Sequence, residues 1–332
     1  MTRYCIWNNK GGVGKTFLTY VLATEYAKQN PEKEVIIVDM CPQANVSEII
    51  LGGNGTGQKK LEQLNQNDRT IAAYIKQRYQ QHERIGNETT YFIQASEYNH
   101  QLPSNIFLLP GDVDLDICSG IINYLAMAPI KNAWTKSRQL LNDLLGAFDQ
   151  TNNKKEKVYF IDCNPSFSAY TELAIISSTA LIVPCTADNA SMRGLANIFN
   201  LLYSKDDEEQ FSNFSDKVRE YGIPLPKVHH IILNRSRSHQ KNASKAFTAS
   251  IEELDTRLAD LKNKYSNAFF ETCPAVCNIK DGNTLATVIN HEGQLLSEIQ
   301  AGMHNVYGCD IQVNQSQIDE LHEDVVSIVK QL

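Results

Sequence analysis

Short apolar runs alternate with longer amphipathic stretches along most of the chain. Val35–Val38 is a continuous apolar run, the pattern of a strand in a sheet that is covered on both faces. Thr16–Gln29 is typical of a helix, since apolar residues recur there every four positions. Further strands are predicted at Tyr4–Trp7, Ile106–Leu109, Val158–Ile161, Ala180–Val183 and His230–Leu233. Strands separated by helices predict an α/β fold, with a mostly parallel twisted sheet and helices on both faces.

Length and composition are those of a soluble globular protein. The 332 residues are 42% hydrophobic and 21% charged, which is sufficient for one large domain with its own core. We expect a single domain over 1–332, with a partly helical insertion at 52–104 and a C-terminal helix at 316–332. The eight cysteines are mostly scattered, as free thiols of a reducing cytoplasm are. No stretch resembles a signal peptide or a membrane span, so we expect a cytoplasmic protein.

A glycine-rich loop lies between the first predicted strand and the first predicted helix. It reads Lys10-Gly11-Gly12-Val13-Gly14-Lys15-Thr16. Its glycines allow the backbone N–H groups to face phosphates, and the helix that follows directs its positive end at them. Lys15 would reach the terminal phosphates of ATP, and the Thr16 hydroxyl would ligate Mg²⁺. Asn9 stands where the common phosphate-loop pattern has glycine, so the strict pattern fails.

The additional lysine of this loop, Lys10, narrows the choice of family. The loop resembles the deviant Walker A loop of the ParA/MinD family of dimerising ATPases. Further similar motifs follow in order within residues 4–300: Asp39 with Pro42–Asn45, Asn105–Leu115, Val158–Ser166, Ala180–Pro184, Arg193–Leu195 and Asn234-Arg235. The resemblance implies a P-loop NTPase fold. Within the family, the sequence most resembles the ParA/Soj-type partition and positioning ATPases. The resemblance also implies an ATP-sandwich homodimer in which Lys10 crosses to the partner's nucleotide, as an arginine finger does.

The resemblance assigns roles to individual residues as well. ATP would be held by Lys10, Gly11, Gly12, Val13, Gly14, Lys15, Thr16 and Phe17, with Asn234 and Arg235 at the adenine. Mg²⁺ would be held by Thr16, Asp39 and Asp162, and the catalytic group would comprise Lys10, Lys15, Asp39 and the residue at position 41.

Position 41 departs from the family, which normally has an aspartate there that orients the attacking water. This sequence has Cys41. A neutral thiol is a weak hydrogen-bond acceptor, and anions nearby should raise its pKa. Loss of a water-orienting group typically reduces the rate by about 10² to 10⁴, so we predict a slow ATPase. Asn164, close to the same switch, is a candidate partial substitute.

A run without acidic residues suggests how the ATP state binds DNA. The net charge is −7, so a uniformly basic surface is excluded, but Tyr221–Ile251 contains no Asp or Glu. Together with the resemblance, this interval favours non-specific DNA binding through phosphate contacts. The candidate contacts are Arg235, Arg237, Lys241, Lys245 and, with a weaker alignment, Lys280. The family further implies nucleoid association, a plasmid, chromosome region or protein body as cargo, and a ParB-like or cargo-specific adaptor that triggers hydrolysis.

Three alternatives stay open at this stage. A MinD-like membrane-associated ATPase would need a basic amphipathic end, whereas Ser316–Leu332 pairs an apolar stripe with an acidic face, so membrane binding is disfavoured. A metal-cluster carrier would need more ligands than the pair Cys273 and Cys277. A nucleotide-gated binding module with vestigial hydrolysis would follow from Cys41.

Overall fold

The computed structural model describes residues 1–332 apart from 82–84, 152–154, 205–213, 237–244 and 274–275. Within these residues one eight-stranded sheet has the order β3-β4-β2-β5-β1-β6-β7-β8. Its strands are β1 (Thr2–Ile6), β2 (Glu34–Met40), β3 (Ile93–Gln94), β4 (Ile106–Leu109), β5 (Lys157–Cys163), β6 (Ala180–Cys185), β7 (Lys227–Ser236) and β8 (Cys277–Lys280). The short edge strand β3 is antiparallel to β4 and the other pairs are parallel, which confirms the predicted mostly parallel sheet.

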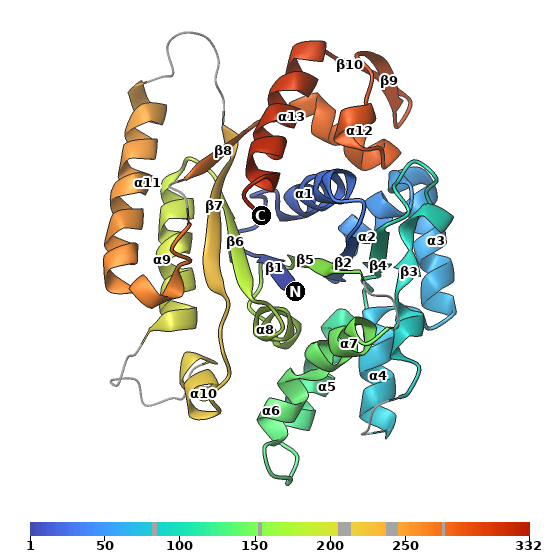
Figure 1. The fold of residues 1–332 in the computed structure, drawn as a ribbon, viewed down its shortest axis with the longest axis vertical. Coiled ribbons are helices and arrows are strands. Elements are labelled where there is room, and N and C mark those ends of the chain that lie inside the picture. Colours follow the sequence, from blue (N-terminus) through green and yellow to red (C-terminus); the bar gives the residue numbers. More distant parts are fainter. Residues whose placement is uncertain (82–84, 152–154, 205–213, 237–244, 274–275) are drawn as a thin grey trace.

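Helices cover both faces of this sheet (Figure 1). They are α1 (Lys15–Gln29), α2 (Asn45–Ile50), α3 (Gly53–Gln66), α4 (Ile71–Gln81), α5 (Leu115–Ala126), α6 (Ala133–Arg138), α7 (Leu140–Asp149), α8 (Ala169–Ile176), α9 (Asn189–Tyr203), α10 (Phe214–Glu220), α11 (Lys245–Lys264), α12 (Asn283–Glu292) and α13 (Gln315–Val329). Single turns of 3₁₀ helix lie at η1 (Glu88–Tyr91), η2 (Ala95–Glu97), η3 (Ser266–Ala268) and η4 (Leu296–Glu298). A separate antiparallel hairpin joins β9 (Gly302–Val306) to β10 (Cys309–Val313).

Two apolar cores explain why the central strands read as continuous apolar runs. Along β2, Ile36 and Val38 pack into the core beneath α5, α7, α8 and α9. Val35 and Ile37 point to the opposite core, beneath α1, α2, α12 and α13. Both sets are fully buried, because a strand alternates its side chains between the two faces of a sheet. The strand pattern predicted for Val35–Val38 is therefore confirmed.

The segment 52–104 is partly helical, as expected, and contains α3 and α4. Its first helix, α3, begins at Gly53, within a glycine-rich run. A Cβ added at Gly57 would overlap with the Glu48 carbonyl, and one at Gly53 would overlap with the His291 carbonyl. These glycines therefore serve close packing of α3 against α2 and α12.

The predicted C-terminal helix forms and packs on the domain. An Asn314–Gln317 capping box starts α13. Its apolar stripe is buried against the core that includes α1, through Ile318, Leu321, Val325 and Val329. Among the described residues, no helix combines the length and apolar character needed to cross a bilayer.

Candidate nucleotide site

The glycine-rich loop makes the turn between β1 and α1 with an open space in front of it. Gly12 and Gly14 have φ values of 74° and 85°, a left-handed conformation that glycine adopts without strain. A Cβ added at Gly11 or Gly12 would meet no atom within 4 Å. The first turn of α1 has no side-chain cap, so its N–H groups are available to an anion. The loop therefore has the shape and donors that a phosphate chain requires.

Lys15 and Thr16 point into this site from the start of α1. The Lys15 side chain is buried, and its Nζ donates to the Lys10 carbonyl at 2.9 Å. Burial lowers the Lys15 pKa, while the charge of Asp162 opposes that shift. The Thr16 hydroxyl donates to Asp162 Oδ2 at 2.8 Å. The structure thus brings the predicted phosphate lysine, metal-ligating hydroxyl and second aspartate together.

Asp39 completes an oxygen-rich corner beside Asp162. The two residues are register partners on β2 and β5. Asp39 accepts hydrogen bonds from the Ser47 hydroxyl at 2.7 Å, the Ser47 N–H at 3.0 Å and the Cys41 N–H at 3.1 Å. Burial raises the pKa of both carboxyl groups, and the charge of Asp39 raises that of Asp162 further. A divalent cation would relieve that repulsion.

The donor set fits Mg²⁺. This ion prefers oxygen ligands, takes one or two carboxylates from a protein, and keeps waters and phosphate oxygens for its other positions. Thr16, Asp39 and Asp162 supply such ligands, and a bound Mg²⁺ would neutralise charge on the phosphates. Ser47 holds Asp39 in place and was not predicted, because it lies eight residues further along the chain.

Cys41 is largely buried beside the two aspartates. Burial raises the pKa of its thiol to about 12, and the charges of Asp39 and Asp162 contribute to the shift. The predicted direction of this shift is confirmed, and the thiol is neutral at physiological pH. Asn164, the candidate substitute, has both ends of its amide engaged: Nδ2 donates to the Tyr170 hydroxyl at 2.9 Å, and Oδ1 accepts from the Ser166 N–H at 3.4 Å.

The side chain of Lys10 lies at the rim of the site and contacts the start of α9. Its Nζ is 2.5 Å from Asp188 Oδ2. The Thr186 and Ser191 hydroxyls also accept from it, at 3.1 and 3.2 Å. Burial alone would raise the pKa of Asp188, but hydrogen bonds from Lys10, Thr186 and the Ser191 N–H outweigh it and hold that pKa well below its usual range.

Two asparagine side chains form hydrogen bonds with the backbone of the glycine-rich loop. Asn8 is fully buried; its Nδ2 donates to the Pro184 carbonyl at 2.6 Å and its Oδ1 accepts from the Lys10 N–H at 2.9 Å. Asn234, expected near the adenine, donates from Nδ2 to the Val13 carbonyl at 2.9 Å. Asn8 was not predicted as a functional residue, although a polar residue directly after an apolar strand was a signal for it.

The predicted DNA contacts are only partly described. Arg237 and Lys241 lie outside the described residues. Arg235 lies on β7 and Lys245 begins α11, but their side chains are not described. Lys280 lies on β8, where its Nζ is 3.3 Å from Glu320 Oε2 and its N–H donates to Asp324 at 2.9 Å. Lys280 is therefore paired with the acidic face of α13.

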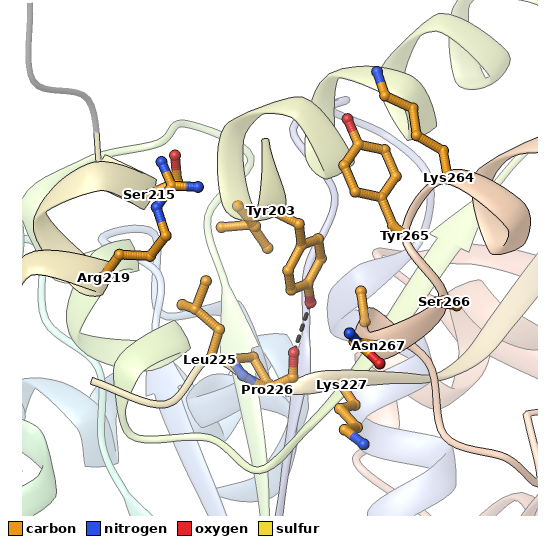
Figure 2. Close-up of a pocket in the computed structure, with 12 residues that line it drawn as sticks. Tyr203, Ser215, Arg219, Leu225, Pro226, Lys227, Lys264, Tyr265, Ser266 and Asn267 are labelled. Atoms are coloured by element: carbon orange, nitrogen blue, oxygen red, sulfur yellow. Dashed lines mark hydrogen bonds between the residues drawn. The ribbon is translucent and has the colours of Figure 1, made fainter. Parts of the chain in front are cut away.

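A separate hollow of about 330 Å³ lies at the amino end of β7 (Figure 2). Tyr203 projects toward it and donates to the Pro226 carbonyl at 2.6 Å. Asn234, at the carboxyl end of the same strand, contacts the phosphate loop. The hollow is thus at the opposite end of the sheet from the nucleotide site.

The cysteine pair considered for a metal cluster lies at and just before β8, the edge strand of the sheet. Cys273 is buried and Cys277, on β8, is half-buried. Over the part of the chain that the structure describes, no three or more His, Cys, Asp or Glu side chains are grouped in a way that could hold a metal ion.

Residues 1–210 match a family model described as AAA domain, and the motifs above are those of its ParA/MinD-like members. The chain belongs to the ParA/MinD family of P-loop ATPases. Two curated Pseudomonas putida sequences, both uncharacterized proteins, are 25% identical to it over 195 residues. Those matches cover 59% of this chain and 60% of each relative.

Several solved structures share the fold of this chain. Apo McdA from Cyanothece superposes with a TM-score of 0.61 at 16% identity, over 98% of both chains. A McdA variant in complex with ATP gives 0.61 at 17% identity, over 99% of this chain and 96% of that one. A putative plasmid partition protein from Borrelia burgdorferi bound to AMPPNP gives 0.57 at 19% identity, over 100% and 99%. These likenesses confirm the predicted P-loop NTPase fold.

Proposed function

We propose that this chain is a ParA-like ATPase that forms an ATP-sandwich dimer, binds DNA without sequence preference, and segregates or positions a cargo. An adaptor protein would trigger hydrolysis and so release the dimer from DNA. The likeness to McdA and to a plasmid partition protein supports this class of function. Nucleotide state and DNA affinity would then be reciprocally linked through the monomer–dimer equilibrium.

The observation that carries the proposal is the different placement of the two loop lysines. Lys15 turns inward and is buried at its own loop. Lys10 lies at the rim, paired with Asp188, and its Nζ donates to side-chain atoms at the start of α9. Once released from Asp188, a cation at the rim would reach a nucleotide in a second copy and stabilise charge on the transferring phosphoryl group.

Hydrolysis would depend on the oxygen ligands of Thr16, Asp39 and Asp162. These residues would hold Mg²⁺, and Lys15 would hold the terminal phosphates. Turnover would be slow, because the neutral Cys41 thiol stands where a carboxylate would orient the attacking water. ATP binding would suffer less than hydrolysis from this replacement.

DNA contacts would come from Arg235, Arg237, Lys241 and Lys245. Lys280 would contribute less, because its ammonium group is already paired with Glu320. Such phosphate contacts make retention fall steeply with salt concentration. The protein would then be cytoplasmic and associated with the nucleoid.

The decisive experiment measures retention of the protein on immobilised duplex DNA with ATP, with ADP and without nucleotide. The wild type should be retained with ATP only, and Lys10→Ala should lose that retention. Lys59→Ala, an exposed lysine of α3, is the matched control and should behave as the wild type. Equal retention in all three nucleotide states would exclude the switch.

Cys41 also favours a second candidate, a nucleotide-gated binding module whose hydrolysis is vestigial. Single-turnover rates with and without DNA separate the two functions, because an active switch must hydrolyse its bound ATP within one cycle. A MinD-like membrane role is less favoured, since the apolar stripe of α13 is buried against the domain.

A further inference from the structure

One face of α5 and its flanks is apolar and open to solvent. Val113, Ile117, Tyr124, Met127 and Ile130 are between 56% and 85% exposed. The first four recur at spacings of four, seven and three residues, which places them on one side of a helix. The opposite side of α5 is buried in the core through Leu115, Cys118 and Ile122. We call the five exposed residues the α5 stripe.

The α5 stripe is extended by a neighbouring helix. The Tyr79 ring on α4 lies edge-on to Tyr124, with ring centroids 6.0 Å apart, and is itself exposed. Single exposed apolar residues are ordinary, but a contiguous row of them marks an interaction surface. Met303 and Tyr307 on the β9–β10 hairpin are similarly exposed but lie on a different element.

A hollow of about 430 Å³ lies at the far end of the stripe. Its lining is mostly apolar: Tyr124, Leu125, Ala128, Ile130, Ala133 and Leu140. Arg78, Lys136 and Ser137 line the rest of it. A hollow of this size accepts one or two large apolar side chains, which is how a central anchor of an interface is normally held.

The end of the stripe near the hollow is basic. Lys131 and Lys136 are exposed, and within the described ranges neither forms an ion pair with a carboxylate. Arg78 is already paired with Asp143 at 3.1 Å. Lys131 and Lys136 therefore lie beside the α5 stripe without a paired carboxylate among the described residues. Such a surface is complementary to a partner that carries apolar and acidic side chains together.

We infer that the α5 stripe and its hollow form the docking surface for an amphipathic helix of the adaptor protein. Apolar side chains of that helix would cover the stripe, one would fill the hollow, and its carboxylates would face Lys131 and Lys136. The inference deepens the proposed function, on whose adaptor it rests. A second copy fits less well. In a two-fold pairing the basic end would face the start of α5, where Asp114 is paired with Lys76 and Asp116 accepts from Tyr170.

The start of the stripe is joined directly to the nucleotide site. Val113 is two residues after Gly111, whose N–H donates to the Ser47 hydroxyl at 2.9 Å. Ser47 in turn holds Asp39, and a Cβ at Gly111 would lie 2.8 Å from the Asp39 carboxyl carbon. A helix that displaces the start of α5 would therefore act on the loop that positions Asp39.

The test uses a labelled helical peptide of about five turns with leucines on one face and glutamates beside them. A matched peptide has lysine in place of every glutamate. Fluorescence anisotropy with the full chain should show the glutamate peptide binding at least about tenfold more tightly. Tyr124→Gln with Met127→Gln should weaken that binding by about tenfold or more. Met303→Gln with Tyr307→Gln is the matched control and should leave it unchanged.

A charge reversal sharpens the test. Lys131→Glu with Lys136→Glu should transfer the preference to the lysine peptide. The inference would be overturned if the wild type bound both peptides equally. It would also be overturned if Met303→Gln with Tyr307→Gln weakened binding of the glutamate peptide as much as Tyr124→Gln with Met127→Gln does. Sedimentation velocity without peptide adds a further arm: a wild-type dimer that Tyr124→Gln with Met127→Gln dissociates would assign the surface to a second copy. Loss of duplex DNA binding in the charge-reversed variant, with peptide preference unchanged, would assign it to nucleic acid.

The same variants distinguish this inference from the proposed function. Tyr124→Gln with Met127→Gln should keep ATP-dependent retention on DNA, because neither residue lies in the nucleotide site. Nucleotide-independent retention by the wild type, with the peptide preference intact, would remove the proposed switch and leave the docking surface standing.

Discussion

The Nζ atom of Lys10 lies 2.5 Å from Asp188 Oδ2 in the isolated chain. Asp188 also caps α9, since its Oδ1 accepts from the Ser191 N–H at 2.8 Å. The lysine that would complete a second copy's site is thus held by the helix that follows β6. If Lys10 is to cross to a partner, this ion pair must break first.

Asp188→Asn should therefore favour the ATP-bound dimer. The amide still caps α9 but no longer attracts Lys10 with a full charge. Because both side chains are partly exposed, the effect should be small, about a two- to fivefold decrease in the dimer dissociation constant. Sedimentation with AMPPNP measures it, and Lys10→Ala serves as the variant expected to lose the dimer. A weaker dimer in Asp188→Asn would mean that Asp188 orients Lys10 for the partner.

Cys41→Asp should accelerate ATP hydrolysis. The carboxylate would accept a hydrogen bond from the attacking water, which the neutral thiol does poorly, so single-turnover rates should rise by about 10² to 10⁴. Cys41→Ser has nearly the same size without the charge, and its rate should stay close to the wild type. No gain in the aspartate variant would show that Cys41 does not limit the reaction.

Two glycines of the loop should respond differently to alanine. Gly14 has a φ of 85° and a Cβ there would overlap with Asn234, so Gly14→Ala should lower both the melting temperature and ATP affinity. Gly11 faces open space, so Gly11→Ala should keep the melting temperature and lose only ATP affinity, because the methyl group occupies the phosphate space. Thermal denaturation and nucleotide titration of both variants check this. A large stability loss in Gly11→Ala would contradict the open geometry.

The sequence was sufficient for the parts of the site that are close together in the chain. Lys15 and Thr16 belong to a loop with a recognisable pattern. Asp39 and Asp162 each follow an apolar run, and a parallel sheet brings the carboxyl ends of its strands together. The residues that were missed act across the fold. Asp188 and Ser47 contact Lys10 and Asp39 only because separate elements meet there.

Some elements were missed for similar reasons. The edge strand β3 has two residues, which are too few to show an alternation of apolar and polar positions. The β9–β10 hairpin has little buried apolar surface of its own, apart from Val306 and Val313, so its alternation is weak. The role of the α3 glycines could not be predicted either, because they allow close contact with other helices and the local sequence carries no signal of that contact.

A buried histidine should make the fold sensitive to mild acid. His230 on β7 is fully buried beside His229, with their Nδ1 atoms 2.6 Å apart. Burial lowers the pKa of His230 to about 4, and the charge of His229 contributes to the shift. The ordinary value is about 6.5, so the unfolded chain takes up this proton first. Stability from the neutral ring is therefore present above about pH 6.5 and is lost as the pH falls toward 4.

The variant His230→Phe isolates this effect. Between pH 7 and about 4 the wild type should lose up to about 3 kcal/mol more unfolding free energy than the variant, since each pKa unit corresponds to about 1.4 kcal/mol. Urea denaturation at a series of pH values measures the difference. His100→Gln, which changes an exposed histidine, should follow the wild-type curve. If His230→Phe and the wild type lose stability in parallel, another group takes up the proton. If His230→Phe is too unstable to compare, the NMR titration of the His230 ring in the wild type gives the same answer, since a midpoint near 6.5 would contradict the burial argument.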